Sequence, residues 1–335
     1  MANLVISNVC NLHCDYCFAR DFLEDNDSGA NRSFISEEAF RSRLDFLERS
    51  DIQAVRLIGG EPGLHPGFAG LLHEAKKRFQ SIVVFSNGTL NDEALAALEA
   101  LPPERLTVMM NMVAAVRPGR EKNLRNRALK RLGPRLILGY TISQVDFTCD
   151  ALIPLVLENN CRKSIRLGLA QPSLVGQNKF LHPGQYPLVG DRIVTFACLA
   201  ASQGIRVEFD CSFVRCMFSQ RGFEALQESG VYAEYRCNPV LDIDLQGQVS
   251  HCFPLAGRFT TPFESQATAS DFRQWFTERT SPFRLAGIYK ECSSCTHKLS
   301  EACTGGCLAA TIMRFRQASF RFVDPSGYKS LPDNR

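Results

Sequence analysis

Short apolar runs alternate with amphipathic stretches over roughly the first two hundred residues of the chain. The apolar runs have the length and composition of strands that are buried on both faces. They read NLVISN at the start, AVRLIGG near 54, SIVVFSNG near 81, ERLTVMMNM near 104, RLILGYTIS near 135 and SIRLGLAQP near 164. The stretches between them are typical of helices. Ser36 and Asn91 are candidate N-caps, each followed by acidic residues in the first turn.

This alternation predicts the fold class. Six βα units in succession imply a parallel sheet with right-handed crossovers. Because a full barrel of this kind needs eight units, we predict an α/β fold built on a partial (βα)6 TIM-like barrel. After about residue 210, cysteine, glycine and turn residues replace the βα rhythm, and CNPVLDIDLQGQVSHC has the pattern of a β-hairpin. The predicted divisions are a barrel over 1–210, a small cysteine-rich C-terminal domain over 211–315 and a polar tail over 316–335.

The composition is that of an ordinary globular protein, apart from its cysteines. Of 335 residues, 45% are hydrophobic and 22% are charged, and the net charge of +3 is too small to indicate nucleic-acid binding. The start MANLVISNVC lacks the features of a signal peptide, and no apolar run is long enough to span a membrane. We therefore expect a cytoplasmic protein. In that reducing compartment, fourteen cysteines favour metal binding or catalysis over disulfides.

Three of these cysteines form a tight motif in the loop after the first predicted strand. Cys10, Cys14 and Cys17 have the spacing Cx3Cx2C. The loop belongs to the carboxyl end of the sheet, where parallel α/β folds place their active sites. Three thiolates can bind three irons of a [4Fe–4S] cluster and leave the fourth iron open to a ligand. A zinc site with His13 as a further ligand is the plainer alternative.

Two further motifs lie at the ends of the next predicted strands. GGEP spans residues 59–62 and SNG spans residues 86–88. Together with the cysteine motif, they make the chain resemble the radical S-adenosylmethionine (radical SAM) superfamily. The resemblance implies a cluster whose fourth iron binds the amino and carboxylate groups of S-adenosylmethionine. Reductive cleavage of that cofactor then yields a 5′-deoxyadenosyl radical, which abstracts hydrogen from a substrate.

The same resemblance implies a set of cofactor-binding residues. They are Tyr16, Gly59, Gly60, Glu61, Ser86 and Asn87. The two glycines would let the backbone approach the ligand closely. The glutamate would accept a hydrogen bond from the methionine ammonium, and the tyrosine would pack near the adenine. The serine and the asparagine would supply the polar contact that the family places at the end of its third strand.

Six more cysteines lie towards the C-terminus in two patterns. Cys237 and Cys252 frame a C-x9-G-x4-C pattern around Gly247, and a C-x2-C-x7-C-x3-C pattern runs from Cys292 to Cys307. Both resemble the SPASM domain, which carries auxiliary clusters in many peptide-modifying radical enzymes, and the shorter twitch arrangement. The chain departs from the full pattern in one longer spacing and in having no cysteine after Cys307.

The resemblance leaves the ligands of the auxiliary clusters open. In the twitch arrangement, one cluster is held by Cys237, Cys252, Cys292 and Cys295. In the full arrangement, one cluster is held by Cys237, Cys252, Cys307 and an upstream thiol, Cys216. A second cluster is then held by Cys292, Cys295 and Cys303, with its fourth site open or filled by a group other than cysteine. A structural zinc knuckle is the alternative to both arrangements.

Other residues carry less specific signals. Cys211 and Cys216 are each open between metal ligand, hydrogen donor and core residue, and Asp210 is a candidate base at the barrel mouth or part of a surface turn. Eight basic residues between 117 and 135 favour a solvated helix face. The alternatives for them are a docking site for an acidic electron donor and a contact to the cofactor carboxylate. Inert buried thiols are expected at Cys149, Cys161 and Cys198.

The combined prediction is a radical SAM enzyme that abstracts hydrogen from a residue of a peptide or protein. The peptide substrate follows from the family association of the C-terminal domain. The expected cofactors are S-adenosylmethionine, the [4Fe–4S] cluster that binds it, and one or two auxiliary [4Fe–4S] clusters. The expected electron donor is flavodoxin or ferredoxin. The alternatives are radical modification of a small molecule such as a sugar or nucleoside, and a zinc- or cluster-binding interaction module without enzymatic activity.

Overall fold

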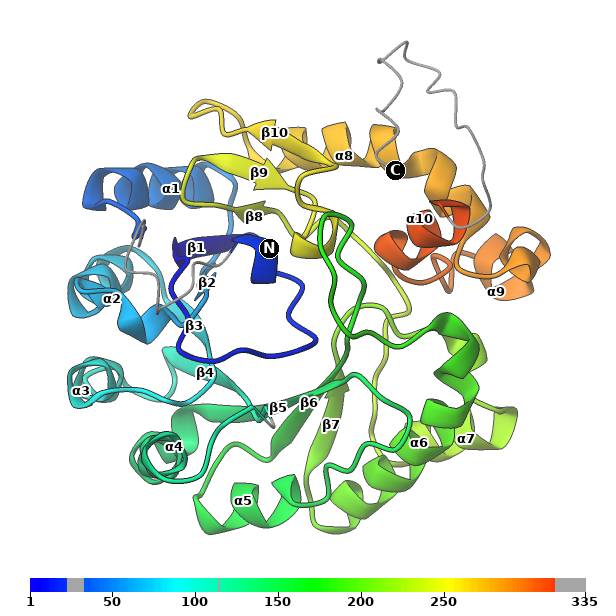
Figure 1. Ribbon diagram of the computed structural model, residues 1–335, viewed down its shortest axis with the longest axis horizontal. Helices are drawn as coiled ribbons and strands as arrows, with labels where there is room; N and C mark the ends of the chain where they lie inside the picture. The colour runs from blue at the N-terminus through cyan, green and yellow to red at the C-terminus, as the bar shows by residue number, and fades with distance from the viewer. Residues whose placement is uncertain (23–32, 114, 317–335) are drawn as a thin grey trace.

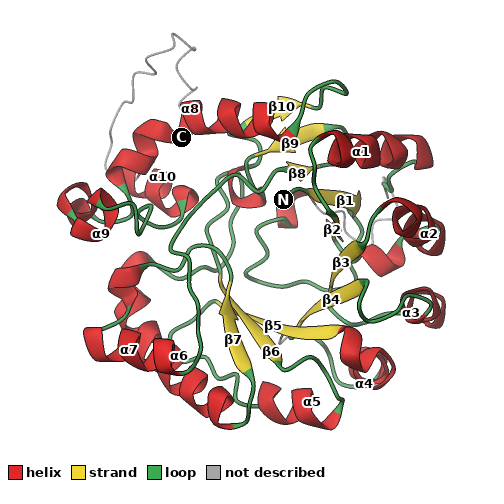
Figure 2. Cartoon of the chain, turned by 180° about the vertical axis from the view of Figure 1, so that it is seen from behind, coloured by secondary structure: helices red, strands yellow, loops and turns green. Residues whose placement is uncertain are grey.

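The computed structural model describes residues 1–22, 33–113 and 115–316 of the chain. Its centre is a sheet in the order β10-β9-β8-β1-β2-β3-β4-β5-β6-β7, in which the strands from β8 to β7 run parallel. The parallel strands are β1 (Asn3–Ser7), β2 (Ala54–Gly59), β3 (Ser81–Ser86), β4 (Leu106–Asn111), β5 (Leu136–Ile142), β6 (Ser164–Leu169), β7 (Arg206–Phe209) and β8 (Asp242–Ile243). Figures 1 and 2 show the sheet curving round a central space, with helices on its outer side.

The outer helices follow the predicted amphipathic stretches. They are α1 (Glu37–Arg49), α2 (Phe68–Arg78), α3 (Asp92–Glu99), α4 (Arg120–Leu132), α5 (Leu152–Glu158), α6 (Tyr186–Ser202) and α7 (Gln220–Glu228). Ser36 caps α1 by accepting the Ala39 N–H, and Asn91 caps α3 by accepting the Ala94 N–H, so both predicted caps are confirmed. The predicted partial barrel is confirmed as well.

The sheet contains more parallel strands than the six βα units predict. The six predicted strands are β1 to β6, and the short segment β7 adds a seventh beside β6. On the other edge, β8 pairs with β1, so the sheet continues across the predicted boundary at residue 210. The predicted division into a barrel over 1–210 and a C-terminal domain over 211–315 therefore stays a prediction. Of the predicted tail, Arg316 is the last residue of a helix, and 317–335 lie outside the described residues.

The cysteine-rich region begins with the predicted hairpin. Strands β8 and β9 (Gln248–Ser250) are antiparallel, and Gly247 between them has a φ of +77°, a conformation that glycine adopts without strain. The rest consists of β10 (Thr260–Pro262), α8 (Ala269–Ala286), α9 (Thr296–Leu299) and α10 (Leu308–Arg316). None of the helices in the described residues has the length and apolar character that crossing a membrane requires.

Candidate active site

The loop after β1 carries the three cysteines of the N-terminal motif. Figure 1 shows this loop, in dark blue, crossing the middle of the barrel. Cys10, Cys14 and Cys17 are all half-buried, and the Cys17 N–H donates to the Cys14 carbonyl oxygen at 3.0 Å. Burial raises the pKa of Cys10 to about 12 and that of Cys14 to about 11. Burial alone therefore favours the neutral thiols, and a bound cluster would stabilise the thiolates by its positive charge.

The end of β2 is held against this loop by direct backbone contact. The Gly60 N–H donates to the Ser7 oxygen and the Glu61 N–H to the Val9 oxygen, both at 2.8 Å. A Cβ on Gly60 would lie 2.2 Å from the Val9 oxygen, and one on Gly59, whose φ is +150°, would lie 2.1 Å from the Ser7 oxygen. The structure thus requires both glycines for close approach to the cysteine loop. Their predicted contact with the cofactor stays a prediction.

Glu61 links the end of β2 to the end of β3. Its side chain is completely buried, and it accepts the Asn87 N–H at 2.7 Å and the Gly63 N–H at 3.3 Å. The Ser86 hydroxyl is a further hydrogen-bond partner. Burial raises the pKa of Glu61 to about 7, against these hydrogen bonds, which lower it. The structure therefore shows Glu61 joining two strand ends, and its bond to a methionine ammonium stays a prediction.

The side chain of Asn87 reaches back to the cysteine loop. Its Nδ2 donates to Asn11 Oδ1 at 2.9 Å and lies 4.0 Å from the Cys10 sulfur. Asn11 Nδ2 in turn donates to Thr89 Oγ1 at 2.8 Å. An amide N–H beside a ligand sulfur is a means by which proteins tune iron–sulfur clusters. The sequence signal for Asn87 was its place in SNG, whereas nothing local marked Asn11 or Thr89.

Tyr16 lies over the carboxyl ends of β4 and β5. Asn111 Nδ2 donates to its hydroxyl oxygen at 3.4 Å, and Thr141 is a second hydrogen-bond partner. The Tyr16 carbonyl accepts a hydrogen bond from Asn178 Nδ2 at 3.0 Å. This position lies inside the barrel mouth, beside the cysteines. The packing of Tyr16 against adenine stays a prediction.

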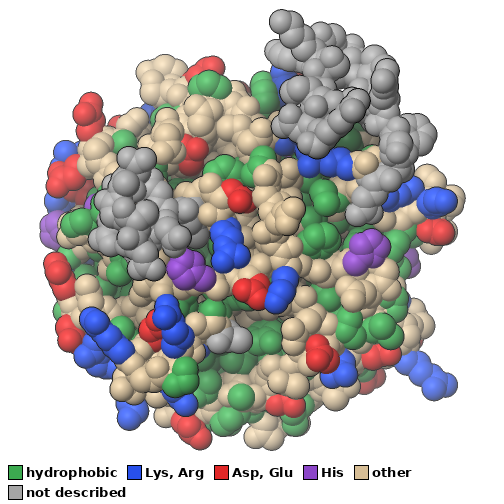
Figure 3. Space-filling model, in the orientation of Figure 1, with side chains coloured by type: hydrophobic (Ala, Val, Ile, Leu, Met, Phe, Trp, Pro, Cys, Tyr) green, Lys and Arg blue, Asp and Glu red, His purple; other side chains and the backbone are tan. Residues whose placement is uncertain are grey.

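One arginine of the basic stretch points into the site. Arg125 of α4 donates from Nη2 to the Val113 oxygen at 3.0 Å, while its Nε is buried without a hydrogen-bond partner. Its positive charge lies close enough to Cys14 and Tyr16 to interact with the ionised form of either side chain. By contrast, Arg127 and Arg131 face outward and form ion pairs with Asp92 at 3.2 and 2.9 Å. Figure 3 shows basic and acidic side chains mixed on this side of the molecule.

Asp210 follows β7 and is already engaged by other groups. Its Oδ1 accepts hydrogen bonds from Arg166 Nη2 at 2.5 Å and from the Cys211 N–H at 2.8 Å. The Arg166 guanidinium also lies 5.6 Å from the centre of the Phe85 ring. The structure therefore places Asp210 at the end of a barrel strand, as the sequence suggested, in an ion pair. Its role as a base stays a prediction.

The cysteines of the C-terminal region sort into two groups in the structure. Cys252 lies close enough to Cys211, Cys237 and Cys307 for the charges of their thiolates to raise its pKa. Cys216 lies within range of Cys292, Cys295 and Cys303. Cys216 therefore lies beside the second group, whereas the full SPASM arrangement, one of the alternatives that the sequence left open, placed it with the hairpin cysteines. Cys211 joins the hairpin group, where the sequence had left it ambiguous.

The spacing within these groups differs from that of a single-ion site. Among the residues that the structure describes, no three His, Cys, Asp or Glu side chains are gathered closely enough to hold one metal ion. A cubane takes one thiolate on each of its irons, so its ligands stand further apart than the ligands of a zinc ion. The arrangement is compatible with cluster binding.

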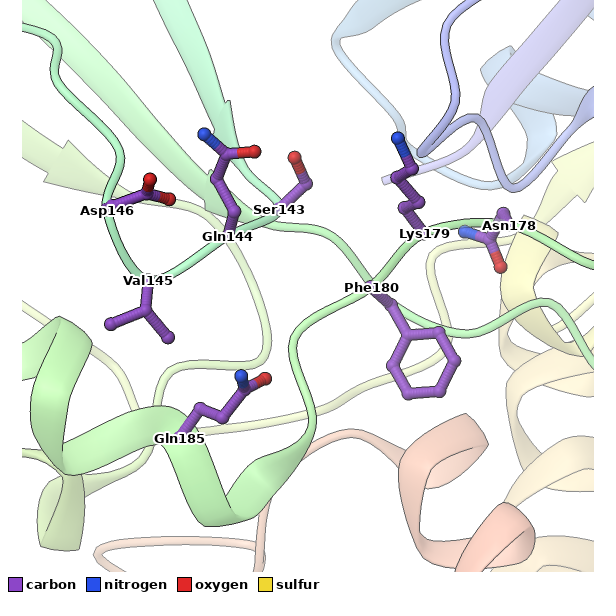
Figure 4. A pocket seen from close by; sticks show the side chains of 8 residues that line it. All are labelled: Ser143, Gln144, Val145, Asp146, Asn178, Lys179, Phe180 and Gln185. Atoms are coloured by element: carbon purple, nitrogen blue, oxygen red, sulfur yellow. The ribbon is translucent and has the colours of Figure 1, made fainter.

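A hollow opens beside the cysteine loop, at the carboxyl ends of β5 and β6. Its volume is about 570 Å³, and it is lined by Ser143, Gln144, Val145, Asp146, Asn178, Lys179, Phe180 and Gln185 (Figure 4). The Lys179 N–H donates to the Asp15 carbonyl oxygen at 2.8 Å, and the side chains of the two residues form an ion pair. The hollow is therefore in direct contact with the segment that carries Cys14 and Cys17.

Comparison with known proteins agrees with this geometry. Residues 4–129 match the family model described as the Radical SAM superfamily. A curated relative, the tungsten-containing aldehyde ferredoxin oxidoreductase cofactor-modifying protein of Pyrococcus furiosus, is 31% identical over 33% of this chain and 30% of its own length. The matched segments amount to about a third or less of the curated relatives.

Solved structures extend the likeness in fold to nearly the whole chain. Native anSMEcpe with bound AdoMet has a TM-score of 0.63 and 16% identity, covering 94% of this chain and 95% of its own. Streptococcus suis SuiB bound to its precursor peptide SuiA has a TM-score of 0.61 and 17% identity, covering 93% of this chain and 72% of its own. The match to the radical SAM superfamily model therefore covers residues 4–129, and the predicted fold class, cysteine-rich C-terminal region included, is confirmed.

The residues present fit the group that this family implies. Three half-buried thiols lie together on the loop after β1, with the Asn87 amide beside Cys10. The orphaned Nε of Arg125 is a buried donor near Cys14 and Tyr16, where an anionic group such as a carboxylate would satisfy it.

Proposed function

We propose that this protein is a radical SAM enzyme that modifies a residue of a peptide. When bound, the [4Fe–4S] cluster and S-adenosylmethionine would supply a 5′-deoxyadenosyl radical for hydrogen abstraction. Cys10, Cys14 and Cys17 would each ligate one iron and leave the fourth to the cofactor. The observation that carries the proposal is the position of these thiols on a strand-end loop, closed on one side by Gly60 and lined on the other by Tyr16 and Arg125.

The peptide substrate is supported by the fold and by the hollow beside the cysteine loop. The fold is shared over 93% of this chain and 72% of the chain of SuiB, which was solved with a bound precursor peptide. Four of the eight residues that line the hollow have amide or hydroxyl side chains, namely Ser143, Gln144, Asn178 and Gln185. Such side chains offer both donors and acceptors, which suits the alternating N–H and C=O groups of a peptide backbone.

The test uses the full chain, reconstituted anaerobically with iron and sulfide. With dithionite and S-adenosylmethionine, we expect 5′-deoxyadenosine to appear in chromatography. Synthetic peptides from short reading frames beside the gene are then compared with nucleosides and sugars. A peptide that increases 5′-deoxyadenosine and itself changes mass supports the proposal. Stimulation by the small molecules alone would overturn the peptide substrate, and absence of any cleavage would overturn the activity.

Arg125→Ala is expected to weaken S-adenosylmethionine binding. The substitution removes a buried guanidinium that we assign to the cofactor carboxylate, and a charge-assisted hydrogen bond of this kind contributes about 1.5–3 kcal/mol. The dissociation constant from calorimetry should therefore rise about tenfold or more. Arg127→Ala, on the outward side of the same helix, is the matched control and should leave it unchanged. If the two variants bound S-adenosylmethionine with equal affinity, the assignment of Arg125 to the cofactor carboxylate would be wrong.

An acidic electron donor is a further part of the proposal. Lys122 and Lys130 are exposed on α4, whereas Arg131 is paired with Asp92 and Glu99. Reversing both lysine charges to glutamate should slow reduction by flavodoxin and leave reduction by dithionite unchanged, since dithionite needs no docking surface. Anaerobic absorbance spectroscopy measures both rates. If reduction by both reductants were slowed equally, the two lysines would have no role in docking an electron donor and would simply belong to a solvated helix face.

A further inference from the structure

Two segments far apart in the sequence pack side by side in the C-terminal region. Gly306 leaves space for Val214, since a Cβ at this glycine would lie 3.1 Å from Val214 Cγ1. Tyr235 forms a β-bridge with Cys303, and its ring lies 6.4 Å from that of Phe218. The segment 211–218 is therefore held along the segment 303–307, which brings its two cysteines close to the second cysteine pattern.

Ser212 shows which group Cys211 joins. Its hydroxyl lies 3.5 Å from the Cys211 sulfur and is also a hydrogen-bond partner of Cys307. Ser212 has a φ of +84°, which is unusual for a residue other than glycine and turns the chain directly after Cys211. Cys211 is thereby directed to Cys307, which lies within electrostatic range of Cys237.

Beyond this turn, Cys216 lies in a short 3-10 helix, η5 (Arg215–Met217), and has different neighbours. It lies within electrostatic range of all three cysteines of the second group, Cys292, Cys295 and Cys303. Room for Cys292 is provided by Gly287, where a Cβ would lie 2.7 Å from the Cys292 sulfur. Cys303 is oriented by the Gly305 N–H, which lies 3.4 Å from its sulfur.

We propose that Cys216 is the fourth thiolate of a second auxiliary [4Fe–4S] cluster, with Cys292, Cys295 and Cys303. Cys211 completes the hairpin cluster with Cys237, Cys252 and Cys307. The chain then holds two auxiliary clusters ligated entirely by cysteine, although no cysteine follows Cys307. The full SPASM pattern has a further cysteine after the position of Cys307, and in this chain Cys216, which precedes the pattern, takes the place of that ligand. Neither cluster offers an open iron, so both serve electron transfer or structure and the substrate binds elsewhere. The inference rests on the cluster binding in the proposed function.

The test measures iron, acid-labile sulfide and Mössbauer spectra in the triple variant C10A/C14A/C17A, which isolates the auxiliary clusters. About eight irons per chain are expected, four for each cubane. Adding C216S should degrade one cluster, seen as loss of iron or as a three-iron signal in electron paramagnetic resonance. C198S, a cysteine outside both groups, is the matched control and should change neither reading. Because Cys216 is exposed, serine is tolerated there, and circular dichroism verifies the fold.

A second background identifies the cluster to which each cysteine belongs. With Cys292, Cys295 and Cys303 also replaced by alanine, about four irons should remain. In that background C216S should have no further effect, whereas C211S should degrade the remaining cluster. Loss of iron on adding C216S there would assign Cys216 to the hairpin cluster and overturn the proposal, as would unchanged iron with C216S in the first background. Cleavage of S-adenosylmethionine by the intact chain is measured separately. The iron counts therefore still assign the auxiliary ligands if the proposed activity is not found.

Discussion

Alanine in place of Cys10, Cys14 and Cys17 together is expected to abolish reductive cleavage of S-adenosylmethionine. These thiols are the half-buried cysteines of the loop that crosses the barrel mouth, and we assign one iron to each. Without them the cluster has no protein ligands, so about four irons per chain should be lost while the auxiliary iron remains. Chromatographic detection of 5′-deoxyadenosine and a colorimetric iron assay measure the two effects.

A cysteine elsewhere in the chain supplies the control for this experiment. Cys149 and Cys161 are buried as predicted, whereas the prediction that Cys198 is buried is wrong, because it lies on an exposed face of α6. Cys198→Ala removes this exposed thiol, whose neighbour is the Ser229 hydroxyl at 3.4 Å, and should leave cleavage and iron unchanged. Residual cleavage in the triple variant would show that the motif does not hold the catalytic cluster. Loss of all iron, auxiliary iron included, would show instead that the loop is needed for the fold of the C-terminal region.

Gly60→Ala is expected to destabilise the protein and to displace the cysteine loop. The added Cβ would lie 2.2 Å from the Val9 carbonyl oxygen and 2.8 Å from the Cys10 backbone nitrogen, so one of the two chain segments has to move. Forcing an extra methyl into such a contact costs about 1–3 kcal/mol or more. Because the displaced segment carries Cys10, iron occupancy of the N-terminal site should fall with the free energy of unfolding. Denaturant unfolding and iron analysis measure these quantities.

Gly70→Ala is the matched substitution for this second prediction. Gly70 is exposed in α2, and a Cβ there meets nothing within 4 Å. In a helix, alanine is favoured over glycine by about 0.5–1 kcal/mol, so this variant should be as stable as the parent or slightly more stable. If the two variants were equally stable, the cysteine loop would accommodate the methyl group by small shifts. The close contact at Gly60 would then not be needed to position the loop.

The barrel was largely predictable because its signals are local. Each predicted strand is a short, mostly apolar run, and β1 to β6 appear where those runs lie. Two of the helices also carry a local start signal, the caps Ser36 of α1 and Asn91 of α3 with acidic residues after them. The seventh strand was harder to identify because Arg206–Phe209 alternates charged and apolar residues over only four positions. Its pairing with β6 is a long-range property of the sheet. The place of β8 beside β1 depends in the same way on the edge that the sheet leaves available.

The sequence by itself determined the resemblance to the radical SAM superfamily, the N-terminal cysteine motif and the strand-end motifs, because their residues lie close together along the chain. Only the tertiary structure decided which arginine of the basic stretch faces the site, that Glu61 is buried between two strand ends, and that Cys216 and Cys211 lie in different groups. These outcomes depend on contacts between distant segments. The packing of Val214 on Gly306 is such a contact, and spacing along the chain carries no information about it.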